Sequence, residues 1–406
     1  MISNNKSAGL QKQKFNKSVR PLFSGTNLPP EQNTMRNMFN LITDRLLRRT
    51  WTETQIRMLV GEYRELYHAY ATDNSNRVNA ASGGAGSALL ISLLEQDEID
   101  GALVCNTVIE KGKIRAHFSI VTSKQEILDA QGSKYVETAF MKEALPLIRQ
   151  FHGRVAVVGL PCDITNLTRW IKKDNGIANK VKLKIALVCG HNSRTELIDE
   201  ISEQLKKEAA SPLRSYRFRK GHWRGELEAE FSNGTTIRKP FSYFSLYQNL
   251  YFYSEKKCLV CHDHFGYQAD ISLGDVWAYR FKQDPIKKTG VIIRTQQGID
   301  LWNSANRSGA ITAEVLEICD ILDGQARTAP FHYNVSARNR VAPLFGYKIP
   351  DNVKARVSWH AWLTALFTLF NMRWSESSQW NKLIFKLPRP LLKAYLYLRK
   401  GIETLP

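Results

Sequence analysis

The stretch Cys258-Leu-Val-Cys261-His-Asp-His264, followed shortly by Ala269-Asp-Ile-Ser-Leu-Gly-Asp-Val-Trp277, carries the strongest signal in this chain. A two-residue spacer lets both thiolates of a tight turn face one metal centre, which ordinary packing does not require. The second segment contains a short apolar strand flanked by Asp270 and Asp275. The stretch therefore predicts half of a metal or cluster site beside a strand.

Two single cysteines are placed to complete this site. Cys162 follows the predicted strand 155–160, and Cys189 follows the next predicted strand, 184–188. Because the carboxyl ends of strands in an open α/β sheet meet at one edge, we expect these thiols near the Cys-x-x-Cys turn. Four thiolates could bind zinc or an iron–sulfur cluster. One local pair with two single cysteines, rather than two local pairs, favours the cluster, and four unrelated buried cysteines remain the alternative.

The two other cysteines are not expected to take part. Cys105 lies inside an apolar strand, and Cys319 lies inside the predicted helical run 313–322. Both are ordinary places for a buried structural thiol.

Composition narrows the class of protein. The 406 residues, 43% of them hydrophobic, suit one large domain or two closely packed ones. Six scattered cysteines are too few for a disulfide-stapled secreted scaffold, so a reducing cytoplasm fits best. No apolar run is long enough to cross a bilayer, which predicts a soluble or membrane-peripheral protein. The formal net charge of +19 favours acidic partners, yet no RNA-binding signature is present, so nucleic acid is not expected.

Hydrophobic periodicity predicts the fold class. The segments 101–108, 116–121, 155–160 and 184–188 indicate strands, with helices at 85–96 and 138–152 between them. Later strands are predicted at 215–218, 226–231 and 235–237, with Asn233-Gly234 as a hairpin turn. We expect an α/β (α+β) fold: a central mixed sheet flanked by helices, a second half with β-hairpins and cluster-binding loops, and a C-terminal helical extension.

The same patterns divide the chain into five parts. We expect a disordered polar tail at 1–34, two packed N-terminal helices at 35–72, an α/β half at 73–211, a C-terminal half with the Cys-x-x-Cys loop at 212–345, and a basic, aromatic helical tail at 346–406. The tail suits a helical hairpin that covers the core, or an interfacial helix pair on anionic lipid or on an acidic partner. The covering hairpin is the favoured interpretation.

A small-residue loop opens the predicted helix 85–96. In Ser82-Gly83-Gly84 the backbone could approach an anionic ligand, and the positive helix end could hold a phosphate. Lys134 in a later loop could neutralise the same phosphate. Neither the Walker A nor the dinucleotide fingerprint is present, and such a helix start is more often only a turn.

Taken in order, these motifs resemble those of a known family. The ordered matches are Ser82-Gly83-Gly84, Gly132-Ser133-Lys134-Tyr135, Gly159-Leu160-Pro161-Cys162, Cys189-Gly190, Phe218-Arg219-Lys220 with Trp223, Cys258 to Cys261, and Asp270 to Trp277. They resemble the coenzyme F420 hydrogenase/dehydrogenase beta-subunit family over roughly Tyr63 to Ala305.

The resemblance implies an iron–sulfur flavoprotein. FAD would bind in the half 73–211, near Ser82, Gly83 and Gly84 and near Ser133, Lys134 and Tyr135. Asp270 and Asp275 could bond the ribityl chain or cluster-loop amides, or merely cap turns. One 4Fe-4S cluster would be held by Cys162, Cys189, Cys258 and Cys261, with zinc as the alternative metal. Such a protein would pass electrons between a ferredoxin-like carrier or redox subunit and a hydride-accepting substrate or deazaflavin.

Departures from the family pattern limit these expectations. No cysteine precedes Cys105, so the additional ferredoxin-like clusters of many members are not expected. The sequence names no catalytic residue: His262 and His264 could be cluster neighbours or proton donors, and Arg219 and Trp223 could frame an anionic substrate or simply belong to a basic hairpin surface. The remaining alternatives are a zinc-stabilised binding protein without redox activity, and a family member that acts in surface-polysaccharide biosynthesis with its basic tail at the membrane.

Overall fold

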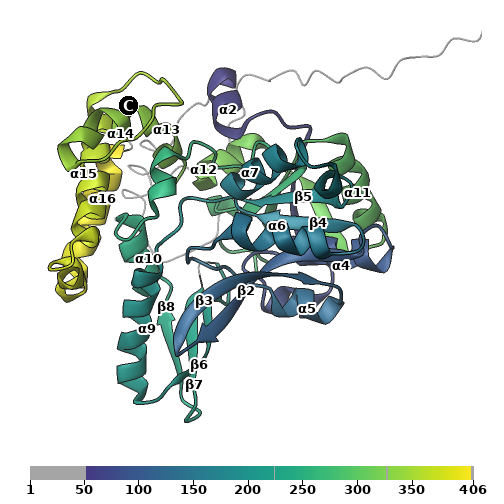
Figure 1. Ribbon diagram of the computed structural model, residues 1–406, viewed down its shortest axis with the longest axis horizontal. Coiled ribbons are helices and arrows are strands. Elements are labelled where there is room, and N and C mark those ends of the chain that lie inside the picture. The colour runs from purple at the N-terminus through teal and green to yellow at the C-terminus, as the bar shows by residue number, and fades with distance from the viewer. Residues whose placement is uncertain (1–51, 224, 326–327, 404–406) are drawn as a thin grey trace, which may run out of the picture. The chain divides into compact units, whose positions relative to one another are not determined.

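The computed structural model describes residues 52–223, 225–325 and 328–403 (Figure 1). The expected polar tail at 1–34 and the first of the two expected N-terminal helices lie outside these residues. The described elements belong to one unit, Arg49–Pro406.

An eight-stranded mixed sheet forms the centre of this unit, in the order β11-β1-β10-β9-β5-β4-β2-β3. Neighbours β2, β4, β5 and β9 run parallel, and the remaining pairs are antiparallel. Strands β4 and β10 are short, mostly apolar runs, as strands covered on both faces require, whereas β5 begins with the alternating Lys182 and Lys184. Their bounds are β1 Glu65–Ala71, β2 Gly101–Glu110, β3 Lys113–Val121, β4 Val155–Gly159, β5 Val181–Leu187, β9 Ile271–Asp275, β10 Thr289–Ile293 and β11 Ile311–Val315.

Helices cover both faces of this sheet (Figure 1). On one face, α4 (Ala85–Glu95), α5 (Lys124–Asp129) and α11 (Gln296–Arg307) pack on side chains such as Ala156 and Ile185. On the other face, α6 (Phe140–Gln150), α7 (Pro161–Ile171) and α8 (Asn175–Ala178) pack on the alternate residues, such as Val157 and Ala186. This arrangement confirms the expected α/β fold with a central mixed sheet flanked by helices.

A second, three-stranded antiparallel sheet contains β6 (Leu213–Lys220), β7 (Glu226–Phe231) and β8 (Thr236–Pro240). The predicted hairpin turn is present, because Gly234 adopts a φ of 85° and Asn233 Oδ1 accepts a hydrogen bond from the Thr235 amide at 3.0 Å. Helices α9 (Thr195–Ala209) and α10 (Ser242–Asn249) pack against this sheet through one apolar cluster.

The helices expected throughout 35–72 do not extend that far. Helix α2 spans Glu53–Val60, and Gly61 then takes a left-handed φ of 74°, a common way for a helix to end. The segment Glu65–Ala71 forms β1 between β10 and β11. The prediction of a helix rested on the helical spacing of residues such as Tyr63 and Leu66. It was wrong here, because hydrogen-bonded pairing with two flanking strands determines the structure of this segment.

Cys319 also differs from expectation. The run 313–322 divides between β11 and α12 (Ile318–Gln325), and Cys319 is exposed rather than buried. It sits on the outer side of α12, since Ile318, Ile321 and Leu322 fill the buried side.

The expected C-terminal helical extension is present. It contains α13 (Ala329–Tyr333), α14 (Val335–Val341), α15 (Trp359–Glu376) and α16 (Arg389–Glu403), and α15 packs against both α14 and α16. No helix in the described part of the chain is long and apolar enough to span a membrane. The five-part division of the chain stays a prediction, and the large sheet draws strands from 35–72, 73–211 and 212–345 alike.

Candidate functional site

Three parallel strands bring the predicted residues to one edge of the large sheet. Cys162 lies in the first turn of α7, directly after β4, and Cys189 follows the end of β5 by two residues. Asp275 ends the neighbouring strand β9. Since these strands are parallel, all three residues stand at the carboxyl edge, where open α/β sheets bind ligands.

The four predicted cysteines line one small pocket. Cys258 lies in the short 3₁₀ helix η1 (Lys256–Val260), and Cys261 follows it directly. Together with Cys162 and Cys189 they face the same space, which is also lined by Leu160, Pro161, His191, Asn192, Lys257, Asp263 and His332. The structure therefore gathers thiols that are as much as 99 residues apart in the chain.

Burial determines the protonation of these thiols. It raises the pKa of Cys258 to about 12 and that of Cys261 to about 11, and it raises the pKa values of Cys162 and Cys189 further above the ordinary range. The protein alone thus holds four neutral thiols at pH 7. A bound metal would have to displace their protons, so its affinity would rise with pH.

The surroundings of the pocket suit thiolate ligands. The Asn192 amide donates a hydrogen bond to Cys258 Sγ at 3.4 Å, a contact of the kind that tunes iron–sulfur clusters. The buried Arg338 guanidinium donates to the carbonyls of Leu259 and Phe331, and its Nη2 atom has no hydrogen-bond partner among the described residues. These groups place positive potential beside the Cys258 loop.

Two histidines fix the backbone next to Cys189. His264 Nδ1 lies 2.7 Å from the Cys189 carbonyl oxygen, and His332 Nε2 lies 2.7 Å from that of Gly190. Burial lowers the pKa of His264 to about 4, so the ring is neutral at pH 7. Its contacts assign His264 the role of a positioning residue.

The described residues contain no group of three or more His, Cys, Asp or Glu side chains close enough to hold one metal ion. A zinc ion keeps each sulfur ligand about 2.3 Å away, which crowds four of them into one tight shell. The four thiols as they stand share a pocket without forming such a shell.

A second group of predicted residues surrounds the loop before α4. Ser82 Oγ donates to the Lys288 carbonyl at 2.7 Å, and the Gly83 amide donates to Thr289 Oγ1 at 3.0 Å. Gly84 has a φ of 77° and starts the helix. The loop is thus held against the start of β10, at the same carboxyl edge as Asp275.

Gly83 has no room for a side chain. An added Cβ would lie 2.6 Å from the Ala69 carbonyl oxygen and 2.7 Å from that of Lys287, both backbone atoms. We expect Gly83→Ala to lower the free energy of unfolding by about 2 kcal/mol, measured by urea denaturation. The same change at Gly401, an exposed position in α16 with open space around an added Cβ, should raise it by up to about 1 kcal/mol. Shifts of the same sign and size in both variants would contradict this prediction.

Arg219 connects the predicted loops to one another. Its guanidinium pairs with Asp275 Oδ2 at 2.6 Å and donates to the carbonyls of Ala81 at 3.3 Å and Trp223 at 3.1 Å. It also donates to the Tyr135 hydroxyl at 3.4 Å. Burial alone would lower the pKa of Arg219, but the Asp275 carboxylate raises it above its usual value, so the cation is permanent.

The 132–135 loop joins this group through Tyr135, whose ring packs against Phe218 and Phe244. Lys134 is partly buried and donates to the carbonyls of its own loop at Ala130, Gln131 and Gly132, and desolvation lowers its pKa to about 8. Ser133 is half-buried beside it.

Asp270 is not brought to this place. It stands at the opposite end of β9 from Asp275, where its carboxylate accepts hydrogen bonds from the Lys184 amide at 2.8 Å and from Thr295 Oγ1 at 3.0 Å. These contacts join β5 to the start of α11.

Two polar side chains connect the cysteine pocket to the Arg219 group. Gln325 donates to the Asp275 carbonyl at 3.1 Å, and its Oε1 lies 3.3 Å from His264 Nε2. Asn192 donates to the Val136 carbonyl at 2.9 Å, while its own amide reaches Cys258 Sγ. The two candidate sites are therefore neighbours along one edge of the sheet.

Sequence reasoning missed several of these residues. Lys287 donates to the Ala80 carbonyl at 2.6 Å, and burial lowers its pKa to about 8. Neither Lys287 nor Gln325 lies in a motif, so no sequence signal marks them. Arg338 and Asn192 likewise contact residues far from them in the chain, so no local pattern marks them. Lys257, in contrast, could have been noticed as the sequence neighbour of Cys258.

The sequence matches two models of one family. The model "Coenzyme F420 hydrogenase/dehydrogenase, beta subunit N-term" matches residues 66–146, and its counterpart for the C-terminal part of the same beta subunit matches residues 152–318. Together they cover more than half of the chain. The chain belongs to the coenzyme F420 hydrogenase/dehydrogenase beta-subunit family. The resemblance drawn from the ordered motifs is confirmed.

Relatives of this family member include the coenzyme F420 hydrogenase subunit beta of Methanosarcina barkeri, 24% identical over 64% of this chain and 84% of that subunit. An uncharacterized protein of Methanocaldococcus jannaschii is 26% identical over 58% of this chain and 61% of that protein. The coenzyme F420-dependent sulfite reductase of the same organism is 25% identical over 65% of this chain. The chain spans only 40% of that reductase's length, and less than two thirds of the uncharacterized protein's.

A solved structure shares the fold of this family member. A chain of the F420-reducing NiFe hydrogenase complex from Methanosarcina barkeri superposes with a TM-score of 0.55 at 20% identity. The superposition covers 73% of this chain and 98% of that one. The large mixed sheet and its flanking helices are thus shared with that chain.

Proposed function

We propose that this protein is a flavin- and iron–sulfur-dependent oxidoreductase. In this proposal it exchanges electrons between a one-electron carrier and a hydride-accepting substrate, with a deazaflavin as one candidate. The observation that carries the proposal is that four thiols from three separate segments face one pocket, beside a second group of loops tied together by Arg219. The family relatives named for coenzyme F420 reactions support the same chemistry.

In this proposal the cysteine pocket holds one 4Fe-4S cluster. Cys162, Cys189, Cys258 and Cys261 would supply the four thiolates, and burial in a pocket lined by Leu160 and Pro161 would limit the access of water. The Asn192 amide and the Arg338 guanidinium would stabilise negative charge on the sulfurs. This donor set is the usual one for such a cluster.

The loops around Arg219 would hold FAD. A flavin bound there would supply the chemistry that couples hydride transfer to single-electron transfer. Ser82, Gly83 and Gly84 present the start of α4, whose backbone dipole favours a phosphate group, and Lys287 adds a nearby cation. Tyr135 and Asp275 would fix the orientation of Arg219 toward the cofactor. Ser133 and Lys134 would contribute the neighbouring loop, and Asp270 would act only by supporting β9.

An anionic substrate or an acidic carrier protein suits the charge of this chain. The formal net charge is +19, and such an excess accelerates encounter with acidic redox partners. For this reason we infer a ferredoxin-like carrier or a partner redox subunit. We also infer a cytoplasmic location, because free thiols persist in a reducing compartment.

Purification without oxygen tests the proposal. We expect a brown protein with a broad thiolate-to-iron absorption band, about four iron atoms per chain, and FAD released on denaturation. Bleaching of the flavin absorbance by a reduced ferredoxin, or by a reduced deazaflavin, would identify the electron donor.

Other results would favour the alternatives. A colourless protein that contains zinc would contradict the proposal and support a zinc-stabilised binding protein. A protein that binds flavin but is reduced by no donor would instead support a role without redox activity in surface-polysaccharide biosynthesis.

A further inference from the structure

Helix α15 exposes large aromatic side chains, while half of its buried side chains are polar. The buried polar residues are Thr364, Thr368, Asn371 and Ser375, and they lie beside the buried apolar residues Ala361, Ala365, Leu369 and Met372. The opposite side exposes Trp359 (65%), Trp362 and Phe370 to solvent. A surface helix of a globular protein normally keeps such large apolar side chains on its buried side.

Helix α16 likewise buries polar side chains and exposes large apolar ones. Its buried side chains are Leu392 and the ion pair of Arg399 and Glu403, whose charged atoms lie 3.4 Å apart. Its outer side exposes Leu391, Tyr397 (71%) and Leu398. The two helices pack against each other, and the Tyr395 hydroxyl donates to Asn371 Oδ1 at 3.0 Å across their contact.

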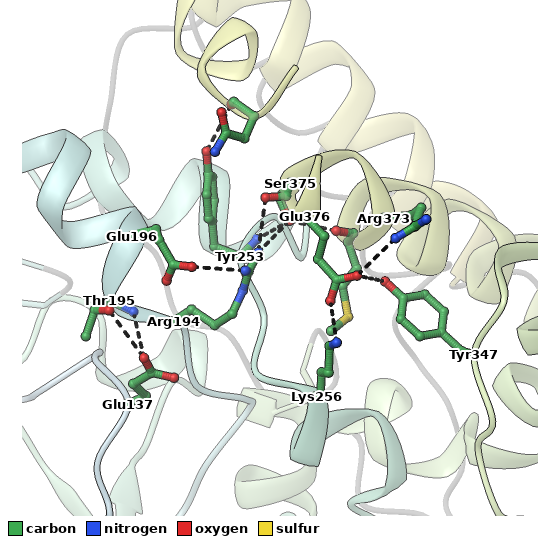
Figure 2. A network of polar contacts seen from close by, with 12 residues as sticks. Glu137, Arg194, Thr195, Glu196, Tyr253, Lys256, Tyr347, Arg373, Ser375 and Glu376 are labelled. Atoms are coloured by element: carbon green, nitrogen blue, oxygen red, sulfur yellow. Dashed lines mark hydrogen bonds and ion pairs between the residues drawn. The ribbon is translucent and has the colours of Figure 1, made fainter. Parts of the chain in front are cut away.

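Polar contacts hold α15 in this orientation (Figure 2). Ser375 Oγ accepts from the Tyr253 amide at 2.9 Å and from Arg194 at 3.2 Å. Glu376 accepts from the Tyr347 hydroxyl at 2.8 Å and pairs with Lys256 at 3.5 Å. Rotating α15 to bury its tryptophans would break these bonds, so the apolar face is fixed outward.

The same extension is strongly basic. Residues 346–403 contain ten lysines and arginines but only Asp351, Glu376 and Glu403 as acids. Two of these acids are committed to contacts inside the extension, since Glu376 bonds Tyr347 and Glu403 pairs with Arg399. Exposed Lys386 and Lys393 therefore flank the apolar side chains with positive charge that nearby acids do not cancel.

We propose that α15 and α16 form a docking surface for an anionic lipid membrane. Trp359, Trp362 and Phe370 of α15 and Leu391, Tyr397 and Leu398 of α16 would enter the headgroup region, and the surrounding lysines and arginines would contact lipid phosphates. Tryptophan and tyrosine are the side chains that favour a membrane–water interface. The contact is peripheral.

The charge and composition favour lipid over protein occupants. Lysine is depleted at protein–protein interfaces, whereas interfacial helices combine lysine with tryptophan and leucine. A second copy of the chain would bring an equally basic extension against the first, which like-charge repulsion opposes. An anionic bilayer can both bury the apolar side chains and bind the positive charge through its lipid phosphates.

Vesicle co-sedimentation of the full-length protein tests this proposal. We expect binding to vesicles of phosphatidylcholine mixed with phosphatidylglycerol, and at least about tenfold weaker binding to phosphatidylcholine alone. Trp359→Ser with Leu398→Ser, one change in each helix, should weaken binding to the mixed vesicles by about tenfold or more. Lys386→Glu with Lys393→Glu should do the same and should also reduce the dependence on salt.

Matched controls distinguish binding through this surface from nonspecific adsorption to vesicles. Met58 and Val315 are equally exposed apolar residues outside the extension, and Met58→Ser with Val315→Ser should leave binding unchanged. Lys172→Glu with Lys173→Glu, an exposed basic pair directly after α7, should have a smaller effect than the change at 386 and 393. Equal binding to both vesicle types, or equal loss in test and control variants, would overturn the proposal. So would self-association in the ultracentrifuge that Trp359→Ser with Leu398→Ser abolishes, since the face would then bind a second copy.

Discussion

Cys258→Ser is expected to remove nearly all of the iron and of the visible absorbance from protein purified without oxygen. Cys258 is buried in η1, its Sγ accepts a hydrogen bond from the Asn192 amide, and it lines the same pocket as the other three thiols. A serine hydroxyl is a poor ligand for iron, and even changes beside a metal ligand typically cost ten- to a hundredfold in affinity. We therefore expect the iron content to fall by more than about tenfold.

Cys319→Ser is the matched control, since Cys319 is exposed on α12 and outside the pocket. It should keep the iron and the absorption band of the parent protein. Iron and absorbance are measured on the same samples, together with circular dichroism to confirm folding. Equal loss in the two variants, or full iron in Cys258→Ser, would show that the cluster uses other ligands.

The second large effect is expected at Asp275. Asp275→Asn leaves the Arg219 guanidinium, whose side chain is 4% exposed, without its carboxylate partner. Removing one member of a buried ion pair typically destabilises a protein by about 3–5 kcal/mol, because the remaining charge is uncompensated. Asp275 is partly exposed, and Arg219 keeps its hydrogen bonds to the carbonyls of Ala81 and Trp223. We therefore expect the free energy of unfolding, measured by urea denaturation, to fall by about 3 kcal/mol, the lower end of this range.

Asp100→Asn provides the comparison for Asp275→Asn. Asp100 also pairs with an arginine, Arg154, but both side chains are about two-fifths exposed, and such surface pairs contribute little to stability. The flavin content of Asp275→Asn should fall as well, because the Arg219 position depends on the carboxylate, while Asp100→Asn should retain its flavin. Similar stability losses in both variants would mean that the buried pair has no special role.

Local patterns predicted most of the fold. The strands around Val157 and Ile185 were recognisable because a strand buried on both faces needs a continuous apolar run. The chemistry of Cys258 and Cys261 was visible because both ligands lie in one turn. The location of Cys162 and Cys189 followed from a general rule for parallel strands.

What failed or was missed depends on partners far along the chain. Tyr63 and Leu66 have helical spacing, but β10 and β11 draw Glu65–Ala71 into the sheet. Lys287 and Gln325 reach the site through hydrogen bonds to residues 207 and 50 positions away, which no window of sequence contains. Asp270 looked equivalent to Asp275 in the motif, yet a strand separates them and sends them to opposite ends of the sheet.

The position of β1 has a consequence for biosynthesis. Both strands that flank it begin more than 200 residues after it ends, since β1 stops at Ala71 while β10 starts at Thr289 and β11 at Ile311. A ribosome that adds about 5–20 residues per second needs roughly 10–50 seconds to produce them. During that time the nascent chain carries an unpaired apolar strand, and a fragment that stops at residue 211 never acquires its partners. We therefore expect slow, chaperone-dependent maturation and insoluble truncation products, because the high contact order of this sheet postpones its closure until most of the polypeptide has been translated.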